Sequence, residues 1–291
     1  MSTSYLGLIL NTAMCCFYYK CINWVFNIDA YRIHIGTFMA IILPFIISLY
    51  GVIKATIITV DKEINIVSSN CKEKCKIVHL SDLHLGAIYQ TGFVERIVNK
   101  VIKINPDIVV ITGDLVDSSM CPCLEWLKPF SKIKVPILYI TGNHEEIVGT
   151  DKVISILKHT NITHIGKNLN GFVYNNNINF IGIDYDYDIN KRVNEIEIPK
   201  DKVNVLLTHV PVMTPKELVG SDITLLLCGH THGGQMFPLH ITSYLNSKCF
   251  KGLYEYMGKF VYVSSGIGTA LFPMRTLSQS TIGVLNVNKF K

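Results

Sequence analysis

Charged residues are scarce in this chain of 291 residues, because Asp, Glu, Lys and Arg together make up only 17% of it. Average proteins contain about 25% charged and about 45–50% apolar residues. The apolar share here, 49%, is ordinary, so the shortage of charge accounts for the positive mean hydropathy of +0.32. Such a composition excludes an intrinsically disordered chain, a coiled coil and a low-complexity chain. It leaves a globular protein with a very apolar core or with a part that lies in a membrane.

Runs of basic residues are also absent. The chain has 27 Lys and Arg against 22 Asp and Glu, a net charge of +5. Nucleic-acid-binding proteins gather basic residues on one face or along one helix, and a nuclease needs a basic or aromatic groove. The sequence therefore predicts no nucleic-acid partner. Its charge supports at most a weak preference for anionic lipid headgroups or phosphorylated substrates.

The nine cysteines form no disulfide framework or zinc module that the spacing would identify. Three residues separate Cys71 from Cys75, and one residue separates Cys121 from Cys123. Neither pair has the further Cys or His ligands of a zinc module, and a one-residue spacing suits a disulfide poorly. We expect structural or incidental thiols.

The missing charge is concentrated near the N-terminus. Residues 33–53 contain no Asp, Glu, Lys or Arg, and about 20 apolar residues cross the hydrocarbon core of a bilayer. Pro44, in the middle of this run, is tolerated in a membrane helix and costly in an ordinary one. Residues 1–19 are also uncharged and predict a second span or a helix in the membrane interface. A cleaved signal peptide fits poorly, because no basic segment precedes the apolar stretch and no small-residue cleavage site follows it.

These observations divide the chain into two parts. We expect residues 1–53 to form a membrane region with one or two transmembrane helices, and residues 54–291 to form one globular domain. The protein would be an integral membrane protein whose partner is the lipid bilayer. Basic residues lie both between the two apolar segments and after the second one, so the positive-inside rule assigns no orientation. The identity of the membrane and the oligomeric state are not predicted.

After residue 60, strand and helix patterns alternate. Residues 76–80, 108–112 and 135–140 are short apolar runs typical of buried strands, whereas residues 91–105 have the apolar spacing of an amphipathic helix. Further helices are expected from residue 124 and over residues 153–159. This alternation predicts βαβ units and a mainly parallel sheet. The later strands follow one another closely and predict a second, mixed sheet; they cover residues 171–174, 179–183, 203–207, 224–227, 259–263 and 283–287.

Polar residues follow five of the predicted strands. In chain order they are Asp82 and His84, Asp114 and Asp117, Asn143 and His144, His209, and His230 and His232. Ligands of open α/β sheets bind outside the carboxyl ends of the strands. The five clusters should therefore converge in space.

Seven of these side chains suit a metal site. Carboxylate, imidazole and amide donors together favour Mn, Fe or Zn over calcium or a thiolate site. Residues two apart, such as Asp82 and His84, face the same side of an extended backbone, and His230 and His232 repeat the spacing. Seven donors exceed what one ion can use with room left for a substrate. They fit two divalent ions that share one bridging carboxylate.

The order of these motifs resembles the calcineurin-like metallophosphoesterase superfamily: Asp-x-His, Gly-Asp-x-x-Asp, Gly-Asn-His-Glu, His and Gly-His-x-His. The variants Ser-Asp-Leu-His-Leu-Gly and Gly-His-Thr-His-Gly-Gly-Gln resemble its membrane-associated branch, which includes bacterial membrane phosphoesterases and eukaryotic transmembrane proteins with a metallophosphoesterase domain. The resemblance covers the chain from about residue 53 to its C-terminus. It implies an α/β fold, a four-layer α/β/β/α sandwich with two mixed sheets.

The resemblance also implies a role for each ligand. One metal ion would be held by Asp82, His84 and His232, the other by Asn143, His209 and His230, with Asp114 bridging the two. His144 matches the family's histidine that contacts the scissile phosphate without binding metal, and Asp117 matches the carboxylate that orients it.

One further residue, Arg275, lies in a segment that resembles the branch's late glycine motif. It would face the substrate phosphate, and the alternative is a surface or structural arginine. The Pro-Glu-Ile that usually follows in this branch is replaced by Gln279-Ser-Thr-Ile282, which puts a glutamate-dependent closure of the region in doubt.

The metal ligands and the further site residues that the resemblance implies point to a metal-dependent phosphoric ester hydrolase. A hydroxide that bridges two divalent ions would attack phosphorus, and His144 would donate a proton to the leaving oxygen. The membrane segment favours a phosphodiester that is membrane-associated or lipid-linked. The alternatives are a phosphomonoesterase that acts on a soluble substrate and a non-catalytic metal-binding scaffold.

Overall fold

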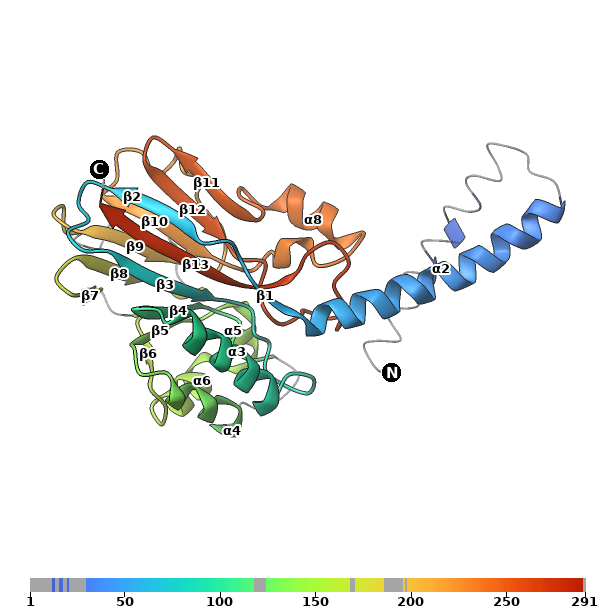
Figure 1. Cartoon of the computed structure of the whole chain (residues 1–291), viewed down its shortest axis with the longest axis horizontal. Coiled ribbons are helices and arrows are strands. Elements are labelled where there is room, and N and C mark those ends of the chain that lie inside the picture. Colours follow the sequence, from blue (N-terminus) through green and yellow to red (C-terminus); the bar gives the residue numbers. More distant parts are fainter. Residues whose placement is uncertain are drawn as a thin grey trace.

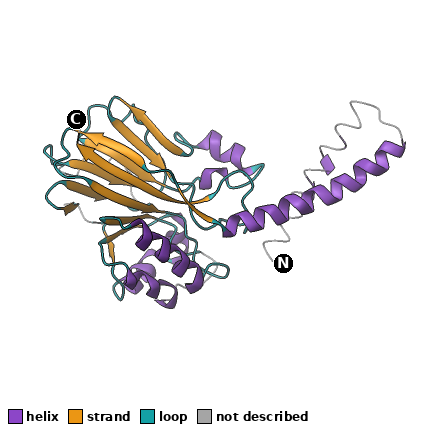
Figure 2. Cartoon of the chain, viewed as in Figure 1, coloured by secondary structure: helices purple, strands orange, loops and turns teal. Residues whose placement is uncertain are grey.

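The computed structural model describes residues 12, 13, 16, 17, 20, 30–117, 124–167, 171–185, 196 and 198–289; within the first long helix, side chains are described from residue 42 onward. Two β-sheets lie against each other, helices cover the outer face of one of them, and helix α2 (Ala30–Thr56) projects from one end of the molecule (Figures 1 and 2). The predicted α/β fold with two mixed sheets is confirmed.

The first sheet has seven strands and contains the buried parallel strands that the sequence predicts. Its order is β1-β13-β3-β4-β5-β6, with β2 also paired to β13. Strands β3 to β6 run parallel to one another, whereas β13 is antiparallel to β3. The strands are β1 (Ile58–Val60), β2 (Ile64–Ser68), β3 (Cys75–Leu80), β4 (Ile108–Thr112), β5 (Ile137–Ile140), β6 (Ile162–His164) and β13 (Ser280–Lys289).

The second sheet has six strands in the order β11-β12-β10-β9-β8-β7. Its four inner strands are parallel, and an antiparallel strand closes each edge, so this sheet is mixed as predicted. The strands are β7 (Phe172–Tyr174), β8 (Ile178–Gly182), β9 (Val203–Leu207), β10 (Ile223–Cys228), β11 (Gly252–Tyr256) and β12 (Lys259–Val263).

The main core lies between the two sheets. Side chains such as Ile77 and Leu138 of the first sheet pack with Phe180 and Leu225 of the second, all fully buried. Because both faces of the central strands are covered, these strands are mostly apolar, as in β4 (Ile-Val-Val-Ile-Thr). Cys71 and Cys75 are free thiols buried at this core, as expected for structural cysteines. Cys121 and Cys123 lie outside the described residues.

Helices cover the outer face of the first sheet. The apolar stripe of α3 (Thr91–Ile104) is buried there, as its spacing predicts. The remaining elements are α4 (Leu124–Leu127), η1 (Lys128–Lys132), α5 (Asn143–Val148), α6 (Thr150–Leu157), η2 (His232–Gly234) and α8 (Leu239–Asn246). On the outer face of the second sheet, Leu218 and Cys249 pack onto the strands, while α8 buries no side chain. The predicted fourth layer of helices therefore stays a prediction for the described part of the chain.

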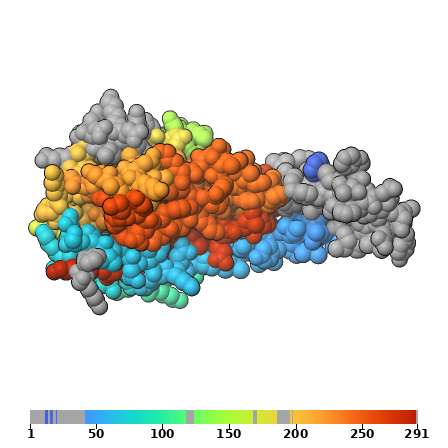
Figure 3. All heavy atoms as spheres, turned by 90° about the horizontal axis from the view of Figure 1, so that it is seen from above, coloured from blue at the N-terminus to red at the C-terminus, as the bar shows by residue number. Residues whose placement is uncertain are grey.

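Helix α2 (Ala30–Thr56) ends on the C-terminal segment of the chain. The backbone N–H of Arg275 donates to the Gly51 carbonyl at 2.9 Å, and Lys54 Nζ donates to the Thr276 carbonyl at 3.1 Å. Figure 3 shows the same neighbourhood, with C-terminal residues in orange and red beside α2 in blue. The boundary predicted at residue 53 thus falls inside a helix that continues to Thr56.

The predicted membrane spans are not supported. Among the residues whose side chains the structure describes, no helix is both long and apolar enough to cross a membrane. Most of the other predicted span, residues 1–19, lies outside the described residues.

Candidate metal centre

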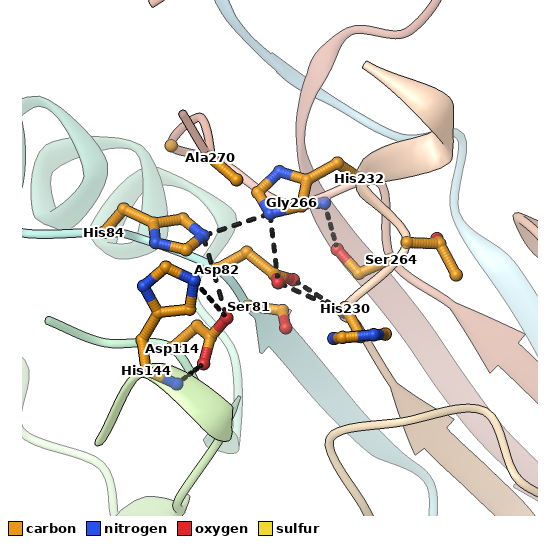
Figure 4. A network of polar contacts seen from close by, with 12 residues as sticks. Ser81, Asp82, His84, Asp114, His144, His230, His232, Ser264, Gly266 and Ala270 are labelled. Atoms are coloured by element: carbon orange, nitrogen blue, oxygen red, sulfur yellow. Dashed lines mark hydrogen bonds and ion pairs between the residues drawn. The ribbon is translucent and has the colours of Figure 1, made fainter. Parts of the chain in front are cut away.

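The loops at the carboxyl ends of five strands meet at one edge of the two sheets, as predicted. Figure 4 shows the residues that lie together there from four of these loops: Asp82, His84, Asp114, His144, His230 and His232. Within the first sheet, the Asp82 N–H donates to the carbonyl of Gly113 at 3.1 Å, which joins the loops after β3 and β4. Within the second sheet, the Gly229 N–H donates to the His209 carbonyl at 2.9 Å. The N–H of His230 then donates to Asp82 Oδ1 at 3.1 Å and connects the two sheets.

Asp82, His84 and His232 form one group of ligand atoms. The Nε2 atoms of the two histidines are 3.0 Å apart, and His232 Nε2 lies 3.4 Å from Asp82 Oδ1. All three residues are buried, and their ligand atoms lie close enough together to hold a metal ion.

Asn143, His209 and His230 form a second group. Asn143 Oδ1 lies 3.0 Å from His209 Nε2 and 3.0 Å from His230 Nδ1, and these two nitrogens are 3.2 Å apart. His209 is buried, Asn143 is half-buried and His230 is exposed. The second group therefore faces the more open side of the centre.

Asp114 lies between the two groups. Its Oδ2 atom is 3.8 Å from His84 Nε2 and 3.3 Å from His209 Nε2. Asp82, Asp114 and His209 also form a potential metal-binding group. One carboxylate is thus placed within reach of ligands from both groups, as a bridging role requires.

The types of ligand atom and the orientation of His209 suit the binding of divalent metal ions. Nitrogen and oxygen donors of this mixture suit Mn, Fe or Zn. His209 Nδ1 donates to the carbonyl of Thr112 at 2.8 Å, which turns Nε2 toward Asn143 and Asp114. Metal-binding histidines are typically held in this way, with the second ring nitrogen bonded to a carbonyl or carboxylate.

Burial keeps most of these imidazoles uncharged. It lowers the pKa of His84 to about 4 and lowers that of His232 well below its usual value. The residue His230 is exposed as a whole, but its ring lies against Asn143 and His209, and this enclosure of the ring lowers its pKa to about 4. Burial also raises the pKa of Asp82 to about 6. An uncharged imidazole is the form that binds a metal ion, so these three histidines need lose no proton at neutral pH.

His209 and Asp114 behave as a charged pair. Burial opposes charge on the His209 imidazole, but the facing Asp114 carboxylate raises its pKa to about 10. Burial likewise opposes the charge of Asp114, and His209 nevertheless holds the pKa of that carboxyl below its usual range. The bridging position therefore carries a negative charge that a bound cation can use.

The backbone of the centre is strained at the candidate ligands. Positive φ angles between 49° and 69° occur at five of the seven, namely Asp82, His84, Asp114, His230 and His232. Residues other than glycine rarely adopt this region, and such strain clusters at functional sites. Two glycines give the ligands room: a Cβ on Gly142 would lie 2.2 Å from Asp114 Oδ1, and one on Gly229 would lie 1.9 Å from Ser81 Oγ.

His144 and Asp117 lie beside the candidate ligands. His144 Nδ1 is 3.9 Å from Asp117 Oδ1, and its Nε2 is 3.9 Å from Asp114 Oδ2. Its ring stands edge-on to that of His84, with centroids 4.6 Å apart. The separations exceed a hydrogen bond and place the imidazole between Asp117 and the centre. The predicted orienting role of Asp117 stays a prediction. His144 also forms a potential metal-binding group with His84 and Asp114.

Arg275 is fully buried, and its guanidinium is used by the protein itself. It donates to the carbonyl of Gly268 at 2.7 Å, to that of His232 at 3.2 Å and to Ser278 Oγ at 2.7 Å. This placement favours the structural interpretation of Arg275 over contact with a substrate phosphate.

Sequence reasoning missed Glu145. Its fully buried carboxylate accepts hydrogen bonds from the N–H groups of Asp114, Val116 and Gly142 at 2.9, 3.0 and 2.6 Å. Burial, helped by the Asp114 charge, raises its pKa to about 7. The residue stands within the Gly-Asn-His-Glu motif, but a single glutamate in the first turn of a short helix gives no sign of its burial.

Asp184 was also missed. Its Oδ1 accepts the N–H of Thr141 at 2.9 Å, and its Oδ2 lies 2.9 Å from His164 Nε2. It follows β8 at the same edge of the sheets as the candidate ligands. That position after a predicted strand was the signal that could have revealed it.

Comparison with known proteins agrees with this geometry. Residues 75–234 match the calcineurin-like phosphoesterase family. An uncharacterized metallophosphoesterase of Helicobacter pylori is 35% identical over 237 residues, which cover 78% of this chain and 63% of that protein. A transmembrane protein with metallophosphoesterase domain of Danio rerio is 30% identical over 269 residues, 84% of this chain and 61% of that protein.

The alignments with these two relatives thus cover less than two thirds of the relatives' own length. Among solved structures, a dimetal phosphatase from Danio rerio aligns with a TM-score of 0.40 and 10% identity over 66% of this chain and 88% of that one. Neither the score nor the identity of that alignment is high enough to bear on the site. The match over residues 75–234, together with the relatives, shows that the chain belongs to the calcineurin-like phosphoesterase family.

Proposed function

We propose that this chain hydrolyses phosphate esters with two bound divalent metal ions. The observation that carries the proposal is the convergence of seven residues with nitrogen or oxygen donors, Asp114 among them, at one edge of the two sheets. The family to which the chain belongs uses two divalent ions, and the structure contains the groups of residues that can bind them.

The proposed ligand sets follow the two groups of the structure. Asp82, His84 and His232 hold one ion, and Asn143, His209 and His230 hold the other, with Asp114 shared between them. The short distances between the histidine nitrogens in each group support this division, because a cation between two such nitrogens would bind both of them.

When bound, the two ions supply electrophilic activation of the phosphoryl oxygens and of a nucleophilic water. The chain supplies the proton chemistry. His144 holds a proton for the leaving oxygen, and Asp117 beside Nδ1 fixes the orientation of the imidazole. The burial of Asp82, His84 and Asp114 excludes bulk water from the inner side of the centre, which strengthens its electrostatic interactions.

The proposed substrate is a phosphodiester that is membrane-associated or lipid-linked. Support comes from apolar side chains of α2 that are about half exposed, which include Phe45, Ile46, Leu49 and Ile53. A hollow of about 210 Å³ beside Tyr50, Ile53 and Ile57 continues this surface toward β1. A relative is named as a transmembrane protein. Apolar surface of this extent suits contact with lipid.

A hydrolysis screen tests the proposal. Purified chain loaded with Mn²⁺ is given a phosphodiester of a phospholipid in vesicles, soluble bis-p-nitrophenyl phosphate and soluble p-nitrophenyl phosphate, with Asp114→Asn as control. We expect the diesters to be cleaved, the lipid diester fastest, and the control to be inactive. Faster cleavage of the monoester would favour a phosphomonoesterase for soluble substrates, and metal binding without any hydrolysis would favour a non-catalytic scaffold.

A further inference from the structure

A hollow of about 200 Å³ opens directly beside the candidate metal centre. It lies between the loop that carries His230 and helix α8. Its lining consists of Val210, His230, Thr231, Thr242, Ser243, Asn246 and Ser247. A cavity of about 150 Å³ accommodates a benzene ring, so this hollow has room for one six-membered ring or a glycerol unit.

The lining is polar and carries no Lys, Arg, Asp or Glu. The charged residue next to the lining in sequence is Lys248, which follows Ser247. Its Nζ atom is paired with Glu217 Oε1 at 2.6 Å. Thr231 Oγ1 and Thr242 Oγ1 donate to backbone carbonyls. Within the described part of the chain, the side chains of Ser243, Asn246 and Ser247 make no hydrogen bond with the protein. These hydroxyl and amide groups therefore offer both donors and acceptors to a ligand.

The hollow and the metal centre share a wall. His230 lines the hollow, while its Nδ1 atom lies 3.0 Å from Asn143 Oδ1 and 3.2 Å from His209 Nε2. A phosphoryl group held at the centre would therefore place one of its ester substituents next to α8.

From this juxtaposition we propose that the hollow binds an uncharged polyhydroxylated group, either a sugar ring or a glycerol unit. This group would be esterified to the phosphorus atom whose other ester bond is hydrolysed. The inference rests on the proposed phosphoesterase function and names the chemistry of one substituent of its substrate. A carboxylate or a second phosphate would lack the cationic partner that such groups require. An alkyl group would displace water from the exposed and half-buried side chains of the lining without offering them hydrogen bonds in return. Hydroxyl groups need no cationic partner, and they form hydrogen bonds with both the donors and the acceptors of the lining.

Two substrates that differ only in hydroxyl groups test the inference: glyceryl p-nitrophenyl phosphate and propyl p-nitrophenyl phosphate. With Mn²⁺-loaded full-length chain, we expect kcat/KM to be about tenfold higher for the glyceryl ester, mainly through KM, since each hydrogen bond contributes a factor of about 2–10. Ser243→Ala and Asn246→Ala should each raise KM for the glyceryl ester about threefold to tenfold and leave the propyl ester unchanged. Leu245→Ser, on the same helix but outside the lining, is the matched control and should keep the preference.

The possible failures are distinguishable. Equal KM values for the two esters in an active wild-type enzyme, or a preference that survives in both Ser243→Ala and Asn246→Ala, would overturn the inference and leave the phosphoesterase function intact. Absence of hydrolysis of either ester by metal-loaded wild-type protein would overturn both. Circular dichroism of each variant confirms that a change in KM does not reflect unfolding.

Discussion

Glu145 Oε2 accepts the backbone N–H of Asp114 at 2.9 Å, so a carboxylate outside the proposed ligand set holds the central ligand in place. The same Glu145 oxygen accepts the N–H of Gly142, and its other oxygen accepts that of Val116. One buried side chain thereby ties the loop after β4 to the start of α5. The geometry of the metal centre depends on this contact as well as on the ligands.

Glu145→Ala should therefore destabilise the protein. Removal of the carboxylate leaves three buried N–H groups without an acceptor, and each such group costs about 1–3 kcal/mol. We expect the free energy of unfolding, measured in urea, to fall by about 3 kcal/mol. Glu146→Ala, one residue along and exposed, is the control and should change it by less than about 0.5 kcal/mol. Equal effects of the two substitutions would show that the contacts of Glu145 are not formed in solution.

Gly229→Ala should impair metal binding. The new Cβ would lie 1.9 Å from Ser81 Oγ and 2.4 Å from Asp82 Oδ2, so Asp82 must move. We expect at least a tenfold loss in affinity for Mn²⁺, measured by calorimetric titration, in line with the effects of disturbing groups around a metal site. Gly92→Ala offers a matched control, because no atom lies within 4 Å of its added Cβ and alanine favours the helix. Unchanged affinity in Gly229→Ala would argue against Asp82 as a ligand.

His144→Ala and Asp114→Asn should separate chemistry from metal binding. If His144 supplies a proton without holding metal, its removal should lower kcat on bis-p-nitrophenyl phosphate at least about 100-fold and leave two ions per chain. Asp114→Asn should lose metal. Elemental analysis and turnover, measured on the same samples, check both expectations. Loss of one ion in His144→Ala would instead make His144 a ligand, a role that its distance to His84 and Asp114 permits.

Arg275→Met should act on stability rather than on substrate binding. The guanidinium satisfies buried carbonyl groups of Gly268 and His232, so its loss should lower the free energy of unfolding by about 3 kcal/mol. Arg96→Met, at an exposed position, should have little effect. A large rise in KM without loss of stability in Arg275→Met would restore the substrate-facing role that the sequence motif suggests.

Much of the fold was readable from the sequence because the central strands are covered on both faces. Short, mostly apolar runs predicted β3, β4, β5 and β9, and the apolar stripe of α3 predicted the helix that packs on the first sheet. Strands β1 and β2 are three and five residues long and lie at the margin of the first sheet, where one exposed face breaks up the apolar run. Helix α8 buries no side chain, so its sequence lacks the regular spacing of apolar residues by which a packed helix is predicted.

The candidate ligands were predictable because they follow strands whose carboxyl ends meet at one edge. Their supports were not predictable. The acceptor role of Glu145 and the burial of Arg275 arise from contacts between loops far apart in the chain, and no local pattern reports these. The long uncharged run predicts a membrane span but does not indicate where helix α2 ends. In the structure, the C-terminal end of α2 is hydrogen-bonded to residues 275 and 276.

The most direct test of the central claim is the rate of bis-p-nitrophenyl phosphate hydrolysis as a function of the number of Mn²⁺ ions bound per chain. The chain is first freed of metal with a chelator and then titrated. We predict no hydrolysis without metal and a maximal rate at two bound ions, with Asp114→Asn inactive throughout. An undiminished rate in metal-free protein, or no hydrolysis when two ions are bound, would contradict the account.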